Sequence, residues 1–341
     1  MKNPALLKRD IVVIGASAGG VEALRGFFRA LPVTLDAAVL VVLHIPPHTP
    51  SHLDRVLANA TQLPVVIAKD GQLIEHGRIY VASADRHLMV TPEGIRLSRG
   101  PKEGRARPSV DVLFRSAATT FGSRVIGVIL SGALDDGTAG LWAIKDHQGK
   151  ALVQIPSEAM HASMSESAIS NVQVDFVGTV EALAAKVGEL VGTAAPAVTD
   201  TAFSLHRSME NDIAMEGNAL KAGVMDLGRV SKYTCPDCHG VLMQIEEGPI
   251  VRFRCHTGHA FSLKTLIAEI NEAIDNSLWA TLRAVEERVM LLRQMEQLAQ
   301  ASGTSDEVTK LRKQADESEK RLQPLRELVL DPAFFGHASQ I

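Results

Sequence analysis

Residues 11–31, IVVIGASAGGVEALRGFFRAL, join an uninterrupted apolar run to a segment whose apolar residues recur every three or four positions. The first part is typical of a buried β-strand and the second of an amphipathic helix, with small residues at the turn between them. Further short β-branched runs alternate with helical patterns up to about residue 190. This alternation predicts an α/β fold: a doubly wound, mostly parallel sheet in a Rossmann-like three-layer arrangement.

The expected strands are rich in Val and Ile, and the expected helices lie between them. Strands are expected at 11–14, 38–43, 65–68, 78–82, 87–90, 124–130 and 151–155. Helices are expected at 21–31, 52–60, 110–121, 139–148 and 180–191. Residues 65–97 are richer in strands than in helices, which predicts an antiparallel excursion in the middle of the domain.

Composition excludes several classes of protein. The 341 residues carry 35 Lys and Arg against 39 Asp and Glu, a net charge of −4, and 4% of them are aromatic. Neither a nucleic-acid footprint nor a base-stacking platform is expected from these values. The longest apolar run, 37–43, is far short of the roughly 20 residues that span a bilayer, and no secretory h-region opens the chain. We therefore expect a cytoplasmic protein without membrane insertion.

The turn Gly15–Gly19 fits the pattern G-x-S-x-G between a strand and a helix. A sharp turn of this kind lifts the Ser17 hydroxyl clear of the sheet. The N–H groups at the start of the helix, that of Ala18 included, are expected to bind a developing oxyanion. A dinucleotide-binding turn is the rival interpretation, but it expects a carboxylate at the end of the second strand, where this chain has none.

Two further polar residues follow buried strands directly. His44 comes after the strand at 38–43, and Asp136 lies between the strand at 124–130 and the next helix. Because the carboxyl ends of parallel strands meet at one edge of the sheet, Ser17, His44 and Asp136 can supply a nucleophile, a base and an orienting carboxylate. Asp135 is the adjacent carboxylate, for which an N-cap or Asx-turn is the alternative role.

Five blocks of sequence, in order, resemble the catalytic domain of the CheB-type chemotaxis receptor-glutamate methylesterases. They are IVVIGASAGGVEALRGFFRALP, VVLHIPPHTPSHLDRVL, HGRIYVASADRHL, RPSVDVLFRSAA and ILSGALDDGTAGLWAIKDHQG. The resemblance covers about residues 9–190. It implies Ser17 as nucleophile, His44 as base and Asp136 as the buried orienting carboxylate. It also implies hydrolysis of glutamyl 5-methyl esters on a methylated receptor protein, and in some members deamidation of receptor glutamine.

The chain departs from the pattern of this family at three places. It has Gly132-Ala133-Leu134 where members usually carry Gly-Met-Gly, Ala18 where Thr is common, and Met164-Ser165 where a Met-Pro pair is expected. These changes are expected to touch the oxyanion wall and the substrate groove. Regulated members carry an N-terminal phosphoacceptor receiver domain, and the sequence predicts none ahead of the first strand.

All three Cys residues fall in one segment, together with a His at ligand spacing. The cluster reads C-x₂-C followed by C-x₃-H, at Cys235, Cys238, Cys255 and His259. Three thiolates and one imidazole at these spacings favour tetrahedral structural zinc, which leaves catalysis itself without a cofactor. His239 and His256 are alternative ligands, and a redox pair at the first two Cys or ordinary cytosolic thiols are alternatives to a metal.

The remainder of the chain reads as appendages to the sheet domain. Apolar residues advance by three or four from 263 to about 301 and again after a break at 302–305, which predicts a helical hairpin or coiled coil. Pro324 is expected to end or kink the second helix. The predicted divisions are 1–191 for the methylesterase-like domain, 192–203 for a linker, 204–262 for a small zinc-ribbon-like module, 263–330 for the hairpin and 331–341 for a tail.

The sequence thus favours a serine-dependent methylesterase that acts on a receptor protein. The alternative is a non-enzymatic signalling or scaffold protein that keeps the esterase fold, because an intact set of catalytic residues is necessary for turnover and not sufficient. The helices at 263–330 need a partner for their apolar stripe. They are expected to pack on each other, on a second copy in a homodimer, or on the helix of a signalling partner.

Overall fold

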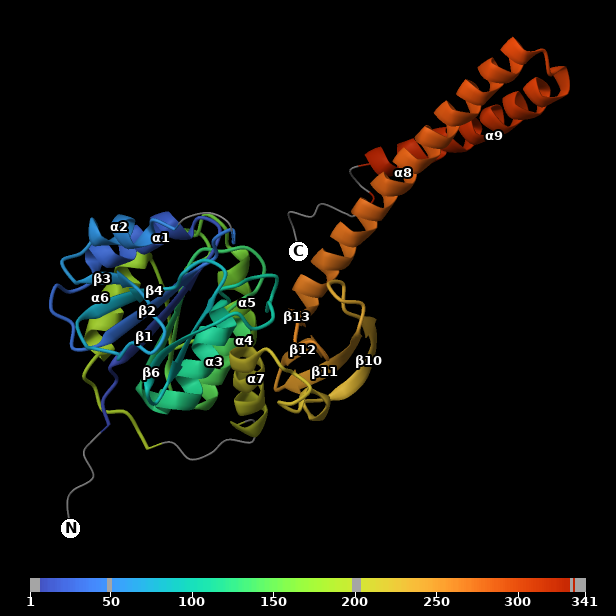
Figure 1. Cartoon of the computed structure of the whole chain (residues 1–341). Coiled ribbons are helices and arrows are strands. Elements are labelled where there is room, and N and C mark those ends of the chain that lie inside the picture. Colours follow the sequence, from blue (N-terminus) through green and yellow to red (C-terminus); the bar gives the residue numbers. More distant parts are fainter. Residues whose placement is uncertain (1–6, 48–50, 198–203, 332–333, 335–341) are drawn as a thin grey trace. The chain divides into compact units, whose positions relative to one another are not determined.

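A computed structural model describes residues 7–47, 51–197, 204–331 and 334 (Figure 1). The chain divides into two compact units, Met1–Thr265 and Leu266–Ile341. The first unit contains a seven-stranded sheet and a separate four-stranded sheet. The Cys residues belong to the smaller sheet and its loops, so the first unit joins the sheet domain to the predicted metal module.

The large sheet is parallel throughout, in the order β3-β4-β2-β1-β7-β8-β9. Its central strand β1 (Ile11–Ala16) pairs with β2 (Ala38–Leu43) on one side and with β7 (Val125–Ile129) on the other. The outer strands are β3 (Val65–Ile67), β4 (Arg78–Val81), β8 (Lys150–Gln154) and β9 (Phe176–Gly178). The chain reverses its direction of winding between β1 and β7, which is where α/β sheets place ligands.

Every residue of β1 and β2 is buried, because helices cover both faces of the sheet. Ile11 and Val13 point into one hydrophobic core, and Val12 and Ile14 into the other. One core holds α1 (Gly20–Ala30), α2 (Leu53–Ala58) and α6 (Val180–Leu190); the other holds α3 (Val110–Phe121), α4 (Thr138–Asp146) and α5 (Ser163–Asn171). The predicted doubly wound, three-layer α/β fold is confirmed.

The predicted antiparallel excursion is confined to one hairpin, β5 (His87–Thr91) with β6 (Gly94–Ser98). The strands β3 and β4, which also lie in the strand-rich stretch, join the parallel sheet instead. Helix α5 and the short strands β6 and β9 were not predicted, because each is brief and only partly apolar. Residues 192–197 of the predicted linker run beside residues 7–9, where Gly192 N–H donates to the Arg9 carbonyl. Residues 198–203 lie outside the described residues.

The second part of the first unit, here called the Cys module, consists of residues 204–262. It begins with α7 (Ser204–Glu216) and contains an antiparallel sheet in the order β10-β11-β12-β13. These strands are β10 (Arg229–Thr234), β11 (Val241–Glu247), β12 (Ile250–Cys255) and β13 (Ala260–Ser262). Short 3₁₀ turns follow α3 (Gly122–Arg124) and precede β10 (Val224–Asp226). The predicted small module is present.

The predicted helical hairpin is confirmed as α8 (Leu263–Ser302) and α9 (Ser305–Leu330). Its buried seam includes Leu282, Val289, Leu311 and Ala315. Of the two outcomes expected at Pro324, an end of the second helix there is wrong, since α9 continues to Leu330, and a kink stays a prediction. Pro324 is exposed, so water can hydrate the carbonyl that loses its N–H partner there. Among the helices in the described part of the chain, none is both long and apolar enough to cross a membrane.

Candidate active site

The three polar residues expected at strand ends meet at one edge of the sheet. Ser17 follows β1, His44 follows β2, and Asp136 lies in the loop after β7. His44 Nδ1 is 3.0 Å from Ser17 Oγ, and His44 Nε2 is 2.7 Å from Asp136 Oδ2. An ionised carboxylate only accepts hydrogen bonds, so Nε2 carries the proton and Nδ1 is free to accept from the serine hydroxyl. The structure thus brings the three residues into one hydrogen-bonded line.

Close packing explains the glycines that flank Ser17. A Cβ on Gly15 would lie 2.2 Å from Cγ1 of Val110, so only glycine lets β1 run beneath the start of α3. Gly19 has a φ of +71°, a left-handed conformation that turns the chain from the strand into α1. The N–H of Ala18, in the same turn, donates to no acceptor within the described residues. That N–H is where the sequence predicted an oxyanion donor.

The carboxylate of Asp136 is fully engaged. Besides His44, it accepts hydrogen bonds from Ser109 Oγ (2.9 Å), Val110 N–H (2.8 Å) and Asp111 N–H (3.0 Å). Burial by itself raises the pKa of this carboxyl. The hydrogen bond and charge of His44 and the N–H groups at the start of α3 outweigh burial, so the pKa lies below the usual 3.8. Asp136 is therefore a fixed anion beside the imidazole.

Sequence reasoning missed the residues that hold this carboxylate. Ser109 is buried and precedes α3, and its N–H donates to Nδ1 of His87 (3.3 Å). His87 Nε2 donates in turn to the Pro101 carbonyl (2.9 Å), and burial lowers the pKa of the imidazole, which keeps it neutral. A serine just before a predicted helix was the one local signal for this support. His87 contacts Pro101, 14 residues further along the chain, and Ser109, 22 residues further along. No local sequence pattern indicated either contact.

A cavity of about 420 Å³ opens onto Ser17 and His44. Its lining comes from the loop after β2, from residues 102–108 and from the loop after β7. The lining residues are Ser17, His44, Ile45, Pro46, Pro47, Asp85, Lys102, Gly104, Arg105, Ala106, Arg107, Pro108, Ala133, Leu134 and Asp136. Ala133 and Leu134, which stand where the family pattern has Met and Gly, thus face the cavity as expected. Ser165, which stands where the family pattern has Pro, does not line the cavity and is fully buried.

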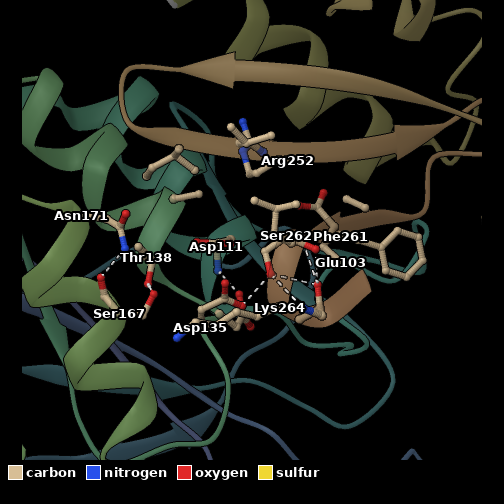
Figure 2. Close-up of a pocket in the computed structure, with 18 of the residues that line it drawn as sticks. Glu103, Asp111, Asp135, Thr138, Ser167, Asn171, Arg252, Phe261, Ser262 and Lys264 are labelled. Carbon is tan, nitrogen blue, oxygen red and sulfur yellow. Dashed lines mark hydrogen bonds between the residues drawn. The ribbon is translucent and has the colours of Figure 1, made fainter. Parts of the chain in front are cut away.

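Asp135, the neighbour of Asp136, has a different partner. Its carboxylate accepts a hydrogen bond from Ser262 Oγ (2.8 Å), at the end of β13 in the Cys module. Figure 2 shows both residues at the edge of a second cavity, of about 200 Å³. Burial raises the pKa of the Asp135 carboxyl. Its side chain thus ties the loop after β7 to the Cys module, a role that neither the N-cap nor the Asx-turn interpretation included.

The four predicted metal ligands also come together. The ligand atoms of Cys235, Cys238, Cys255 and His259 all lie within 4.8 Å of one another. Two of the pairs, Cys238 Sγ with Cys255 Sγ and Cys235 Sγ with His259 Nδ1, are each 3.6 Å apart. Tetrahedral zinc with Zn–S bonds of about 2.3 Å places thiolates roughly 3.7 Å apart, so this donor set fits such an ion. The cluster can hold a metal; His239 and His256 are not part of it.

A serine, an imidazole and a buried carboxylate in one line at the ends of parallel strands is the arrangement of serine hydrolases. A family model described as CheB methylesterase matches residues 12–187, just over half of the chain. The chain belongs to the CheB methylesterase family, as its sequence blocks predicted.

Individual relatives agree with this assignment. A protein-glutamate methylesterase/protein-glutamine glutaminase 2 of Methanosarcina acetivorans is 36% identical over 192 residues, 54% of this chain and 54% of the relative. A Yersinia pseudotuberculosis protein-glutamate methylesterase/protein-glutamine glutaminase is 39% identical over 160 residues, 46% of this chain and 45% of the relative. The crystal structure of the Thermotoga maritima CheB methylesterase catalytic domain aligns with a TM-score of 0.53 and 31% identity, over 54% of this chain and 100% of that domain. The chain spans about half the length of the first two relatives.

Proposed function

We propose that this chain hydrolyses glutamyl 5-methyl esters on a methylated receptor protein, with Ser17 as nucleophile. The observation that carries the proposal is the line Ser17–His44–Asp136, with separations of 3.0 and 2.7 Å, in a member of the CheB methylesterase family. The cavity beside Ser17 is open to an extended side chain. A cytoplasmic place of action fits a chain with free thiols at a metal cluster.

In the proposed mechanism, Ser17 Oγ attacks the ester carbonyl while His44 Nδ1 takes the hydroxyl proton. The tetrahedral oxyanion accepts from the N–H of Ala18. Collapse breaks the bond to the methoxy group, which leaves as methanol with the proton from His44. Water then attacks the acyl-enzyme, again with His44 as base, and releases glutamate and free Ser17. Asp136 stabilises the imidazolium in both steps.

Glutamine is a second substrate for the same chemistry. Attack of Ser17 on a glutamine side-chain amide gives the same acyl-enzyme, with ammonia as the leaving group in place of methanol. The names of the relatives include glutaminase activity, which supports this extension. Ammonia release from a glutamine-containing receptor segment would measure it separately from methanol release.

The test of the proposed function is methanol release from a peptide that carries glutamate 5-methyl ester. Ser17→Ala removes the nucleophile and is expected to lower the rate by at least about 10⁴-fold. Ser163→Ala is the matched control, because Ser163 is the first residue of α5 and its hydroxyl donates to the Gly132 carbonyl (3.3 Å); this variant is expected to keep most of the activity. Equal rates for wild type and Ser17→Ala would contradict the proposal and favour the scaffold alternative.

We propose that the metal of the Cys₃His cluster is zinc and that it is structural, because four protein ligands leave no open position for a substrate. Purified protein is expected to contain about one zinc per chain. Cys235→Ser is expected to lower that content, whereas His239→Ala, outside the cluster, is expected to leave it unchanged. Elemental analysis measures both.

We also propose that the second unit pairs through its helices with a second copy or with a signalling partner's helix. Met290 and Leu298, on α8, remain 63% and 65% exposed after the hairpin forms. Light scattering on the full chain measures the particle mass. A mass of two chains that falls to one in Met290→Glu/Leu298→Glu supports self-association, and a monomeric wild type favours the partner.

A further inference from the structure

One wall of the catalytic cavity is a segment without secondary structure. Residues 102–107, here called the pocket wall, include five that line the cavity around Ser17: Lys102, Gly104, Arg105, Ala106 and Arg107. They belong to no helix or strand. Two backbone hydrogen bonds between Glu103 and Ala106, of 3.3 and 3.0 Å, close it into a narrow turn. Because the pocket wall belongs to no helix or strand, its position depends on the residues that it packs against.

The backbone of the pocket wall pairs with the last strand of the Cys module. Gly104 N–H donates to the Ala260 carbonyl (2.9 Å), and Ala260 N–H donates to the Lys102 carbonyl (3.2 Å). Figure 2 shows Glu103 beside the residues of β13. The pocket wall is thus hydrogen bonded to the edge strand of the small sheet, and it also lines the cavity at Ser17.

A buried ion pair anchors the same segment. The Glu103 carboxylate, 3% exposed, accepts from Arg115 of α3 (2.9 and 3.0 Å) and lies 2.9 Å from Nη2 of Arg254 in β12. Burial alone would raise the pKa of Glu103, but the two guanidinium groups lower it to about 2. Glu103 is therefore ionised, and Arg254 links it to the Cys module.

Arg254 is also tied to the metal cluster. It precedes the ligand Cys255, and its Nη1 donates to the carbonyl of Gly258 (2.9 Å), just before the ligand His259. The turn between these ligands packs against the residue that precedes the wall, since a Cβ on Gly258 would lie 2.6 Å from Cγ of Pro101. A change in the shape of the cluster therefore reaches Arg254 and Pro101 directly.

The pocket wall separates the two cavities. Gly104 and Asp136 line both of them. A Cβ on Gly104 would lie 3.8 Å from Cβ of Asp136 and 3.9 Å from Cγ2 of Thr265. A displacement of the wall would change the cavity at Ser17 without breaking any hydrogen bond of Ser17, His44 or Asp136.

We propose that the Cys module is a structural part of the catalytic pocket. Arg254, acting through Glu103, is a positioning residue for the pocket wall, and a metal on the Cys₃His cluster holds Arg254 and β13 in place. The claim about position rests on the contacts above; the claim about catalysis also rests on the proposed methylesterase function. It differs from the expectation from sequence that residues 204–262 are an appendage to the sheet domain.

Arg254→Met and Arg252→Met form a matched pair of variants. Both arginines lie on β12, both are buried and both donate to Glu210, but Arg254 alone of the two contacts Glu103. Hydrogen exchange of the amides of residues 102–107 needs no activity. Arg254→Met is expected to speed this exchange about tenfold or more relative to Arg252→Met. Equal exchange in the two variants would overturn the proposal.

Kinetics on a peptide carrying glutamate 5-methyl ester measure the catalytic part. Arg254→Met is expected to raise KM about tenfold with a smaller loss of kcat, because the wall contacts substrate and not the reacting bond. Labelling of Ser17 by a small fluorophosphonate should stay within about twofold of wild type, since it needs the triad alone. Arg254→Lys, which keeps the charge, should recover part of the KM. A KM for Arg254→Met equal to that of Arg252→Met would overturn the catalytic claim.

Removal of the metal from the full chain tests whether the Cys₃His cluster holds the pocket wall in position. Exchange of residues 102–107 should quicken after treatment with a chelator and slow again when Zn²⁺ alone is restored. Unchanged exchange would overturn the role of the cluster. If the exchange results hold while wild type releases no methanol from the peptide, the proposed function fails and the positioning of the wall stands.

Discussion

The parallel-sheet domain and the Cys module, which share the first unit, are stabilised by different interactions. The sheet domain buries aliphatic side chains on both faces of every central strand. The described residues of the Cys module form a small apolar cluster around Ile213 and Ile245. Beside it, buried guanidinium groups at Arg207, Arg252 and Arg254 meet the carboxylates of both parts. An apolar core tolerates any side chains of the right shape and volume, whereas an ion pair requires its particular partner. Because some of those partners belong to the sheet domain, the position of the Cys module depends on the sheet domain.

The strongest test of the comparison lies in the two neighbouring carboxylates of the β7 loop. Asp136 serves the sheet domain's hydrogen-bonded line and Asp135 binds the Cys module. Asp136→Asn is expected to lower methyl ester hydrolysis about 10⁴-fold, because the imidazole loses its charged partner. Asp135→Asn keeps a hydrogen-bond acceptor for Ser262 and is expected to cost less than about tenfold. Equal losses of kcat/KM would remove the distinction between the two residues.

Deletion of core volume in the sheet domain should have the next largest effect. Phe114 is fully buried in α3, and Phe114→Ala is expected to lower the free energy of unfolding by about 3–5 kcal/mol. Val33→Ala, at a side chain that is 57% exposed, should change it by less than about 0.5 kcal/mol. Chemical denaturation followed by circular dichroism measures both. A loss at Phe114 as small as that at Val33 would contradict an apolar origin of the domain's stability.

The ionic contacts predict a pH dependence that the apolar core lacks. Since the folded pKa of Glu103, about 2, lies below its usual 4.5, the stability it contributes is fully present above pH 4.5 and is lost as the pH falls towards 2. Glu103→Gln should therefore destabilise the protein by about 3 kcal/mol at pH 7. The difference from wild type should shrink steadily below pH 4.5. A difference independent of pH would show that the charge of Glu103 is not what matters.

The smallest expected effect is the pH dependence of stability contributed by Asp111, which is opposite in sign to that of Glu103. Burial and the charge of Asp136 raise the pKa of Asp111 well above 3.8, so the wild-type protein loses stability as the pH rises from 3.8 through that higher value. Asp111→Asn keeps an acceptor for the Gly140 N–H and removes the titration. Relative to wild type, its free energy of unfolding should increase with pH over this range. Denaturation curves at several pH values measure the slope, and parallel slopes would contradict the expectation.

The same contrast explains what could be predicted from sequence. The parallel sheet follows from uniformly apolar runs, and the approach of Ser17, His44 and Asp136 follows from their places directly after such runs. The metal cluster follows from spacing within one short segment. Each is a local pattern that one stretch of chain carries by itself.

Contacts between segments that are distant in the sequence are not indicated by any local sequence pattern. Helix α7 was not predicted because it turns Arg207 and Glu210 inward, which hides the usual apolar stripe of a buried helix. The pair Glu103–Arg254 joins residues far apart in the chain, and neither residue is unusual among its neighbours. For the same reason the pocket wall looked like an ordinary loop. Its partner is visible only when the two sheets are folded together.

The four hydrogen bonds to Asp136 have a consequence for the energy of the proton transfer itself. A carboxylate offers about four acceptor positions, and here one imidazole N–H, one hydroxyl and two backbone N–H groups take them up. No position remains for water, and the donors from the start of α3 are fixed by the helix. When His44 becomes positively charged, its counter-ion is already oriented and has no solvent shell to rearrange. The reorganisation energy on this side of the imidazole is therefore met during folding rather than at each turnover.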